Sequence, residues 1–174
     1  LVSDKAQDRH VLLALDVPDA IGHIDDHFAE KGIGVEDCLT LECVNSVPGA
    51  LALLYMLKND YSFVLLPPMR KGRGKTGVQL PAPAFCRYEV VIERSSDDRP
   101  AARLDHPETF LCIAENGRYH HGRNAESKRE PKLYLRTSGS IGSPKMAAHS
   151  HTKLFGNAMN CVERFELGCD DRIA

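Results

Sequence analysis

Two apolar runs that flank one helical segment, all within residues 38–66, restrict the fold of this chain more than any other feature. The runs at 38–44 and 61–66 are typical of strands, and Pro67-Pro68 ends the second one. Between them, Asn45-Ser46-Val47-Pro48 combines an N-cap with a proline in the first helical turn. We expect the apolar face of this helix to consist of Val47, Ala50, Leu51, Leu54 and Leu57. A strand–helix–strand unit joins parallel strands, so the sequence predicts an α/β fold with a mainly parallel sheet flanked by helices.

Further elements are predicted on both sides of this unit. Residues 20–31 have apolar positions at helical spacing, and Gly32 follows as a candidate C-cap. Strands are predicted at 86–92, 109–114 and 132–136, and a polar loop from Asn116 to Lys132. After Lys145, a short extended segment leads to a helix from about Thr152 to Gly168. The apolar stripe expected on that helix consists of Leu154, Ala158, Cys161, Val162 and Phe165.

Composition excludes several classes of protein. The chain has 174 residues, enough for one domain, and a net charge of −2, which does not indicate a nucleic-acid partner. No apolar run reaches the roughly 20 residues that span a bilayer, and the first residues do not resemble an export signal. The six cysteines form no CxxC pair, so we expect reduced thiols, no metal site and a cytoplasmic location.

Two segments compete as phosphate-binding loops. Gly74-Lys75-Thr76 has the ending of a Walker A loop, but Met69 stands where that motif needs its first glycine. We therefore interpret this segment as a solvated basic loop. The second candidate, Thr137–Lys145, is a Thr/Ser/Gly-rich turn that follows the predicted strand at 132–136. Consecutive backbone amides in such a turn form a concave anion-binding nest, and a lysine adds a mobile positive charge. This second segment predicts a binding site for the phosphates of a nucleotide.

The second segment resembles the phosphate-binding motif of the adenylate-forming superfamily, Thr/Ser-Ser-Gly-Thr/Ser-Thr-Gly-x-Pro-Lys. This superfamily includes acyl-CoA synthetases, acyl-AMP ligases, nonribosomal peptide adenylation domains and luciferases. The residues that match the motif are Thr137, Ser138, Gly139, Ser140, Gly142, Pro144 and Lys145. Residues 37–68 and 154–174 are also similar to the segments that flank the motif in that family. Two residues depart from the pattern, because Ile141 replaces a threonine and Met146 replaces a glycine.

The resemblance implies a function and a site. It implies that residues 1–174 are one partial domain, the N-terminal part of an AMP-binding domain, and that the remainder of that adenylation domain is a partner. The parent enzyme would use ATP and Mg²⁺ to convert a carboxylic acid to an acyl-adenylate, and would pass the acyl group to CoA or a phosphopantetheinyl carrier protein. The residues implied to hold the phosphates are Thr137, Ser138, Gly139, Ser140, Gly142 and Lys145. Lys145 is also the catalytic candidate, and His149 and His151 are the substrate-binding candidates.

Two alternatives remain open at this point. The later motifs of the family, including a metal-binding glutamate and a second lysine, are missing from the chain. Together with Ile141 and Met146, this absence allows a truncated, non-catalytic binding module. A Walker-type NTPase that uses Lys75 is the other alternative. The first residue is not methionine, and the last residues, Asp170-Asp171-Arg172-Ile173-Ala174, lead into an apolar segment, so we expect the chain to be part of a longer polypeptide.

Overall fold

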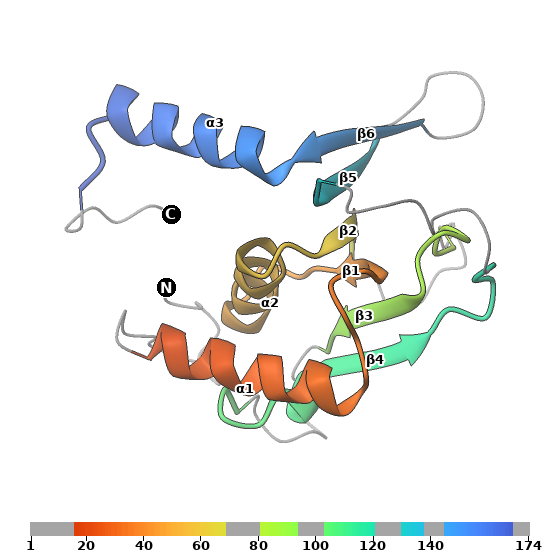
Figure 1. Ribbon diagram of the computed structural model, residues 1–174. Helices are drawn as coiled ribbons and strands as arrows, with labels where there is room; N and C mark the ends of the chain where they lie inside the picture. The colour runs from red at the N-terminus through yellow and green to blue at the C-terminus, as the bar shows by residue number, and fades with distance from the viewer. Residues whose placement is uncertain (1–15, 69–80, 94–102, 121–129, 138–144, 169–174) are drawn as a thin grey trace, which may run out of the picture.

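The computed structural model describes residues 16–68, 81–93, 103–120, 130–137 and 145–168. Within these ranges, one six-stranded sheet has the strand order β4-β3-β1-β2-β5-β6 (Figure 1). The strands are β1 (Cys38–Glu42), β2 (Ser62–Leu66), β3 (Tyr88–Ile92), β4 (Leu111–Glu115), β5 (Lys132–Thr137) and β6 (Lys145–Ser150). The helices are α1 (Val17–Glu30), α2 (Val47–Lys58) and α3 (His151–Arg164), with one turn of 3-10 helix, η1 (Pro107–Thr109).

The sheet is mixed and has a parallel centre. Strand β1 pairs in parallel with β2 and β3, and β2 pairs in parallel with β5. Each edge strand is antiparallel, because β4 returns along β3 and β6 returns along β5. The connection between β5 and β6, residues 138–144, is too short for the crossover that a parallel partner needs. The prediction of an α/β fold is confirmed, and the expected parallel order holds for the four inner strands but not for the two edges.

Local sequence explains the sharp start of α2. The Ser46 hydroxyl accepts a hydrogen bond from the Gly49 amide at 3.2 Å, which satisfies one of the unpaired amides of the first turn. A proline lies in the same turn, where its missing N–H costs nothing. Gly49 is required there, because a Cβ at this position would collide with the Val44 carbonyl oxygen. The predicted N-cap segment is therefore confirmed.

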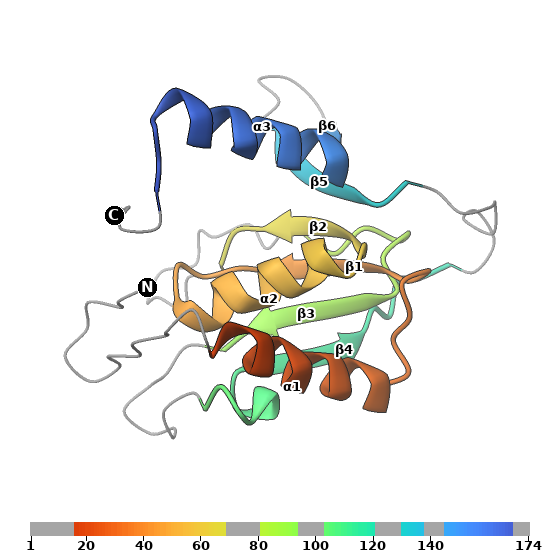
Figure 2. The ribbon, with the colours of Figure 1, turned by 60° about the vertical axis from the view of Figure 1, so that its left-hand side comes forward.

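The main core lies between α1, α2 and one face of the sheet (Figure 2). Its centre is aromatic, because the Phe28 ring packs edge-on against Tyr55 and Tyr61 with centroids 4.8 and 5.6 Å away. The Tyr55 hydroxyl donates a hydrogen bond to an Asp25 oxygen at 2.9 Å. The pKa of Tyr55 is raised, and burial is the largest cause. The predicted inner face of α2 is partly wrong, because Leu54 is 46% exposed and Tyr55 is fully buried.

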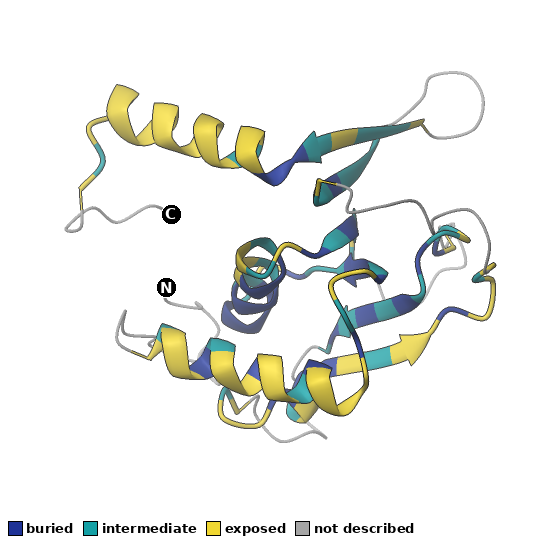
Figure 3. Ribbon diagram, in the orientation of Figure 1, coloured by how far each residue is buried: buried dark blue, intermediate teal, exposed yellow. Residues whose placement is uncertain are grey.

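Helix α3 lies on the same side of the sheet as α1 and α2 but stands apart from them (Figures 1 and 3). Its first residues contact the core, where Leu154 is half-buried. The rest of its expected apolar stripe is exposed within the described structure, including Val162 at 38% and Phe165 at 66%. The prediction of the helix is confirmed. No helix in the described ranges is both long and apolar enough to cross a bilayer.

The cap of α2 yields a stability prediction. We expect Ser46→Ala to lower the free energy of unfolding by about 1 kcal/mol, because the Gly49 amide loses its acceptor. Denaturant unfolding followed by circular dichroism measures this change. Ser46→Asp is the matched control, since aspartate also accepts at an N-cap and should unfold like the wild type. Equal losses in both variants would contradict the capping role.

Candidate functional site

The β5–β6 hairpin presents the two flanks of the predicted phosphate loop. Thr137 ends β5, Lys145 begins β6, and the two residues are direct partners in the antiparallel register. The Thr137 hydroxyl donates a hydrogen bond to the Lys145 carbonyl oxygen at 3.1 Å. Both residues are exposed. The two ends of the loop are thus held as close together as two residues paired across neighbouring antiparallel strands.

The other predicted residues of the loop lie outside the described residues. These are Ser138, Gly139, Ser140 and Gly142, together with Ile141 and Pro144. The rival Walker-like segment, Gly74-Lys75-Thr76, also lies outside them. The structure therefore describes where the Thr137–Lys145 loop begins and ends.

The loop flanks lie at the carboxyl edge of the parallel strands. Strands β1, β2, β3 and β5 run in the same direction, so Glu42, Leu66, Ile92 and Thr137 end at one edge of the sheet. Ligands of open α/β sheets bind at this edge. The N-terminus of α2 also begins here, directly after β1, and carries the positive end of the helix dipole. Two strand spacings, about 10 Å, separate β1 from β5. This edge therefore suits an anionic ligand.

The two candidate substrate histidines lie toward the other end of the hairpin. In the β5–β6 register, His149 pairs with Leu133 near the start of β5. At about 3.3 Å per residue, His149 is about 13 Å and His151 about 20 Å along the chain from Lys145. The structure thus brings Thr137 and Lys145 together and leaves both histidines apart from them. Their role in binding substrate stays a prediction.

His151 occupies an unusual environment for a polar side chain. Its side chain is 7% exposed and packs edge-on against the Phe63 ring, with centroids 6.1 Å apart. Neither ring nitrogen makes a hydrogen bond within the described ranges. The nearest charge is an Asp60 oxygen, 3.7 Å from Nδ1. His151 therefore supports the junction of β6 and α3 through packing.

Sequence reasoning missed a polar cleft between α1 and η1. The cleft has a volume of about 630 Å³. Its polar lining consists of His23, Asp26, His27, Glu30, Lys31, Asp105, His106 and Glu108. These side chains come from segments about eighty residues apart, so no local motif could indicate the cleft. The four carboxylates outnumber the one lysine, so the cleft is a poor site for a polyphosphate such as a nucleotide.

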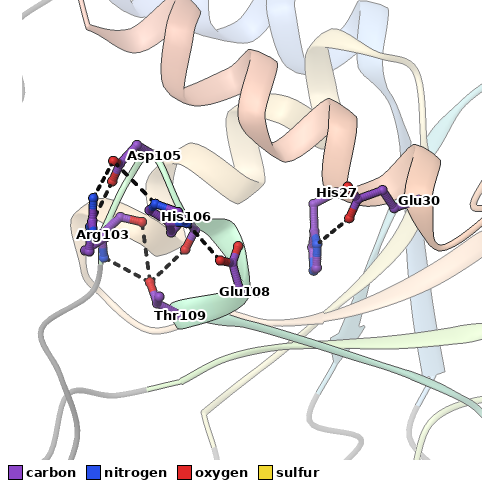
Figure 4. A network of polar contacts seen from close by, with 7 residues as sticks. All are labelled: His27, Glu30, Arg103, Asp105, His106, Glu108 and Thr109. Atoms are coloured by element: carbon purple, nitrogen blue, oxygen red, sulfur yellow. Dashed lines mark hydrogen bonds and ion pairs between the residues drawn. The ribbon is translucent and has the colours of Figure 1, made fainter.

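Two carboxylates of the cleft, Asp105 and Glu108, lie beside basic side chains (Figure 4). An Arg103 nitrogen lies 2.8 Å from an Asp105 oxygen, and His106 Nδ1 lies 2.9 Å from a Glu108 oxygen. The Arg103 hydrogen bond is the main cause that lowers the pKa of Asp105. A backbone hydrogen bond, followed by His106, lowers the pKa of Glu108. Among the described residues, no group of three or more His, Cys, Asp or Glu side chains is arranged to hold a metal ion.

The Arg103–Asp105 pair predicts a pH-dependent stability. A carboxyl whose pKa is lowered by folding stabilises the fold above its unfolded pKa of about 4, and this contribution is lost as the pH falls through the folded value. We expect Arg103→Gln to lower the melting temperature slightly at pH 7 and not at about pH 2. Thermal unfolding at both pH values measures the difference. The exposed Arg118→Gln is the control, and an unchanged Arg103→Gln deficit at low pH would contradict the assignment.

Comparison with known proteins finds a partial match to a ligase. The chain is 32% identical over 93 residues to an indoleacetate–CoA ligase of Aromatoleum aromaticum (strain EbN1). The matched stretch covers 53% of this chain and 14% of that ligase, so the chain spans only a small part of its relative. No protein-family model matches the chain. The match supports a relation to the adenylate-forming enzymes that the Thr137–Lys145 segment resembles.

Proposed function

We propose that the chain is part of an enzyme that uses ATP to join a carboxylic acid to a thiol through an acyl-adenylate. The similarity to a CoA ligase supports this reaction class. The observation that carries the proposal is the position of Thr137 and Lys145, paired at the carboxyl edge of the sheet on either side of a motif that resembles a phosphate loop. CoA is the acceptor that the relative's name favours, and a carrier-protein thiol is the alternative.

Lys145 would act on the phosphates of MgATP. In adenylation, a carboxylate oxygen attacks the α-phosphorus, the bond to the β-phosphate oxygen breaks, and pyrophosphate leaves. Negative charge accumulates on the leaving pyrophosphate, so a positive group fixed beside it lowers the barrier. The exposed Lys145, which directly follows the loop in sequence, would supply that charge. Mg²⁺ would be held mainly by the phosphates of the nucleotide.

Thr137 would position the loop. A hydroxyl has one proton to donate, and the Thr137 proton is directed at the Lys145 carbonyl oxygen. In this arrangement the hydroxyl cannot also donate to a phosphate. The hydroxyl oxygen can still accept a hydrogen bond, but an anionic phosphate has no proton to donate to it. The hydrogen bond therefore orients the backbone of Lys145, and with it the direction in which the lysine side chain leaves the hairpin.

A non-catalytic binding module is the second candidate. Ile141 removes a hydroxyl that the resembled motif offers to the phosphates, which would cost about 1–3 kcal/mol of binding if that group were used. Met146 adds a half-buried side chain where the motif has glycine. A module of this kind would bind nucleotide or a protein partner without pyrophosphate exchange.

Lys145 provides the principal functional test. We expect Lys145→Ala in the complete protein to lower the rate of ATP–pyrophosphate exchange by roughly 100-fold, because the charge beside the leaving group is lost. Lys153→Ala removes an exposed lysine from α3 and should leave the exchange unchanged. Lys75→Ala tests the Walker-like segment in the same assay. Loss of exchange in Lys75→Ala with full activity in Lys145→Ala would contradict the proposal.

Thr137 provides a second functional test. Thr137→Val keeps the β-branched shape and removes the donor to the Lys145 carbonyl oxygen. We expect a several-fold rise in KM for ATP, because the loop flanks lose a hydrogen bond worth about 1 kcal/mol. Thr137→Ser restores the donor and should recover most of the affinity. Identical kinetics of the valine variant and the wild type would exclude a positioning role.

A further inference from the structure

Two cysteine side chains meet at the amino edge of the sheet. Cys38 is the first residue of β1, and Cys86 lies two residues before β3. Their sulfur atoms are 3.7 Å apart, although the residues are 48 positions apart in sequence. Cys86 is completely buried and Cys38 is half-buried. Successive side chains of a strand point to opposite faces of the sheet, and Leu39 belongs to the main core. Cys38, the residue before it, therefore lies with Cys86 on the opposite face.

The two backbones at this pair are held by contacts that do not involve sulfur. The Arg87 amide donates to the Cys38 carbonyl oxygen at 2.6 Å, and the Arg87 guanidinium bonds to the buried Asp37 carboxylate at 3.0 Å. On the other side, the Asn116 amide group donates to the Cys86 carbonyl oxygen at 2.8 Å. The hydrogen bond that Arg87 donates to Asp37 is the first cause that raises the pKa of Arg87. The two backbones are therefore held side by side without a bond between the sulfurs.

The geometry suits a disulfide. A disulfide needs its sulfurs at about 2.05 Å and its Cα atoms at about 4.4–6.8 Å. The Arg87 amide, one residue after Cys86, bonds to the Cys38 carbonyl oxygen, so the two backbones run side by side at about the 4.8 Å spacing of neighbouring strands. To form the bond, the two sulfurs must approach from 3.7 Å to about 2.05 Å. Rotation of the two side chains about their Cα–Cβ bonds changes the sulfur–sulfur distance without moving the strands.

We propose that Cys38 and Cys86 form a site of reversible thiol–disulfide exchange whose reagent is a small disulfide such as oxidised glutathione. The Cys38 sulfur attacks one sulfur of the reagent, the S–S bond of the reagent breaks, and one small thiol leaves with the Cys38 proton. The Cys86 sulfur then attacks the Cys38 sulfur of the mixed disulfide. The second small thiol leaves with the Cys86 proton. Two protein thiols are oxidised and one small disulfide is reduced to two thiols.

The environment sets the order of these two steps. Cys38 is the more accessible thiol, so it meets the reagent first. The hydrogen bond between the two thiols, followed by burial, raises the pKa of the Cys86 thiol. Cys86 therefore reacts second, when the disulfide bond of Cys38 is already in contact with it. This is the arrangement of an attacking and a resolving cysteine.

The other described cysteines lack this arrangement. Cys43 is half-buried, its sulfur faces the carbonyl oxygens of Val44 and Gly49, and burial raises its pKa. Cys112 and Cys161 are exposed and free. A resolving thiol must lie in contact with the sulfur that reacts first. Within the described ranges, Cys38 and Cys86 are the cysteines whose sulfurs make such a contact. An exposed cysteine without such a neighbour stops at the mixed disulfide.

Oxidation at this pair would cross-link the centre of the sheet. The bond would join β1 to the segment that leads into β3, at the edge opposite to Thr137 and Lys145. It would leave the carboxyl edge accessible, so the proposal is independent of the proposed ligase activity. Its effect is on stability, because a cross-link restricts the unfolded chain.

Mass spectrometry of the complete wild-type protein tests the proposal. The protein is incubated with oxidised glutathione, its free thiols are alkylated under denaturing conditions, and it is digested without reductant. We expect a peptide pair joined through Cys38 and Cys86, which dithiothreitol separates, and a rise in the thermal unfolding midpoint that dithiothreitol reverses. Persistent glutathione on Cys38 beside an alkylated Cys86 would overturn the proposal. Reaction of Cys112 and Cys161 alone would overturn it as well.

Two variants extend the same experiment. Cys86→Ser removes the resolving thiol, so we expect at least a tenfold increase in glutathione retained on Cys38. Cys112→Ser is the matched control and should form the Cys38–Cys86 bond as the wild type does. Absence of an adduct on Cys38 in a folded Cys86→Ser protein would contradict the order of the steps. If Cys86→Ser does not fold, the wild-type measurement alone decides the outcome.

Discussion

The parallel pairing of β1 with β2 around α2 is the constraint on which the rest of the structure depends. Leu39 and Leu41 of β1, with Phe63 of β2, are fully buried against the helical layer. At about 25 cal/mol per Å², burying each such side chain contributes roughly 2 kcal/mol. Because both strands run the same way, the pairing defines one carboxyl edge, and β3 and β5 add to the sheet in that direction. The location of the candidate site follows from the shared direction of these strands.

The β5–β6 hairpin connects this edge to the proposed chemistry. Strand β5 adds to β2 and carries Thr137 to the carboxyl edge, and the antiparallel β6 begins there with Lys145. In the proposed site, the strand pairing keeps both flanks fixed and the segment between them would present amides and hydroxyls to a ligand. The Cys38–Cys86 pair lies at the amino edge, so the two proposals concern opposite edges of the same strands.

Local signals in the sequence predicted the elements, and long-range contacts decided the details. The Ser46 cap and the strand–helix–strand unit were predictable because their causes lie within a few residues. Leu54 and Tyr55 occupy neighbouring helical positions, and Tyr55 is buried because Phe28 and Tyr61, from elsewhere in the chain, surround its ring. His149 and His151 follow the loop closely in sequence, but a returning strand carries them away from Lys145. The loop residues Ser138 to Gly142 remain predictions.

The structure of the complete protein with a non-hydrolysable ATP analogue and Mg²⁺ tests the proposed phosphate site. We predict that the terminal phosphates lie within hydrogen-bonding distance of the Lys145 ammonium and of backbone amides between Thr137 and Lys145. The adenine should then extend along the carboxyl edge of the parallel strands. Phosphates bound at another edge or in the α1–η1 cleft, with the 137–145 segment directed away from them, would contradict it.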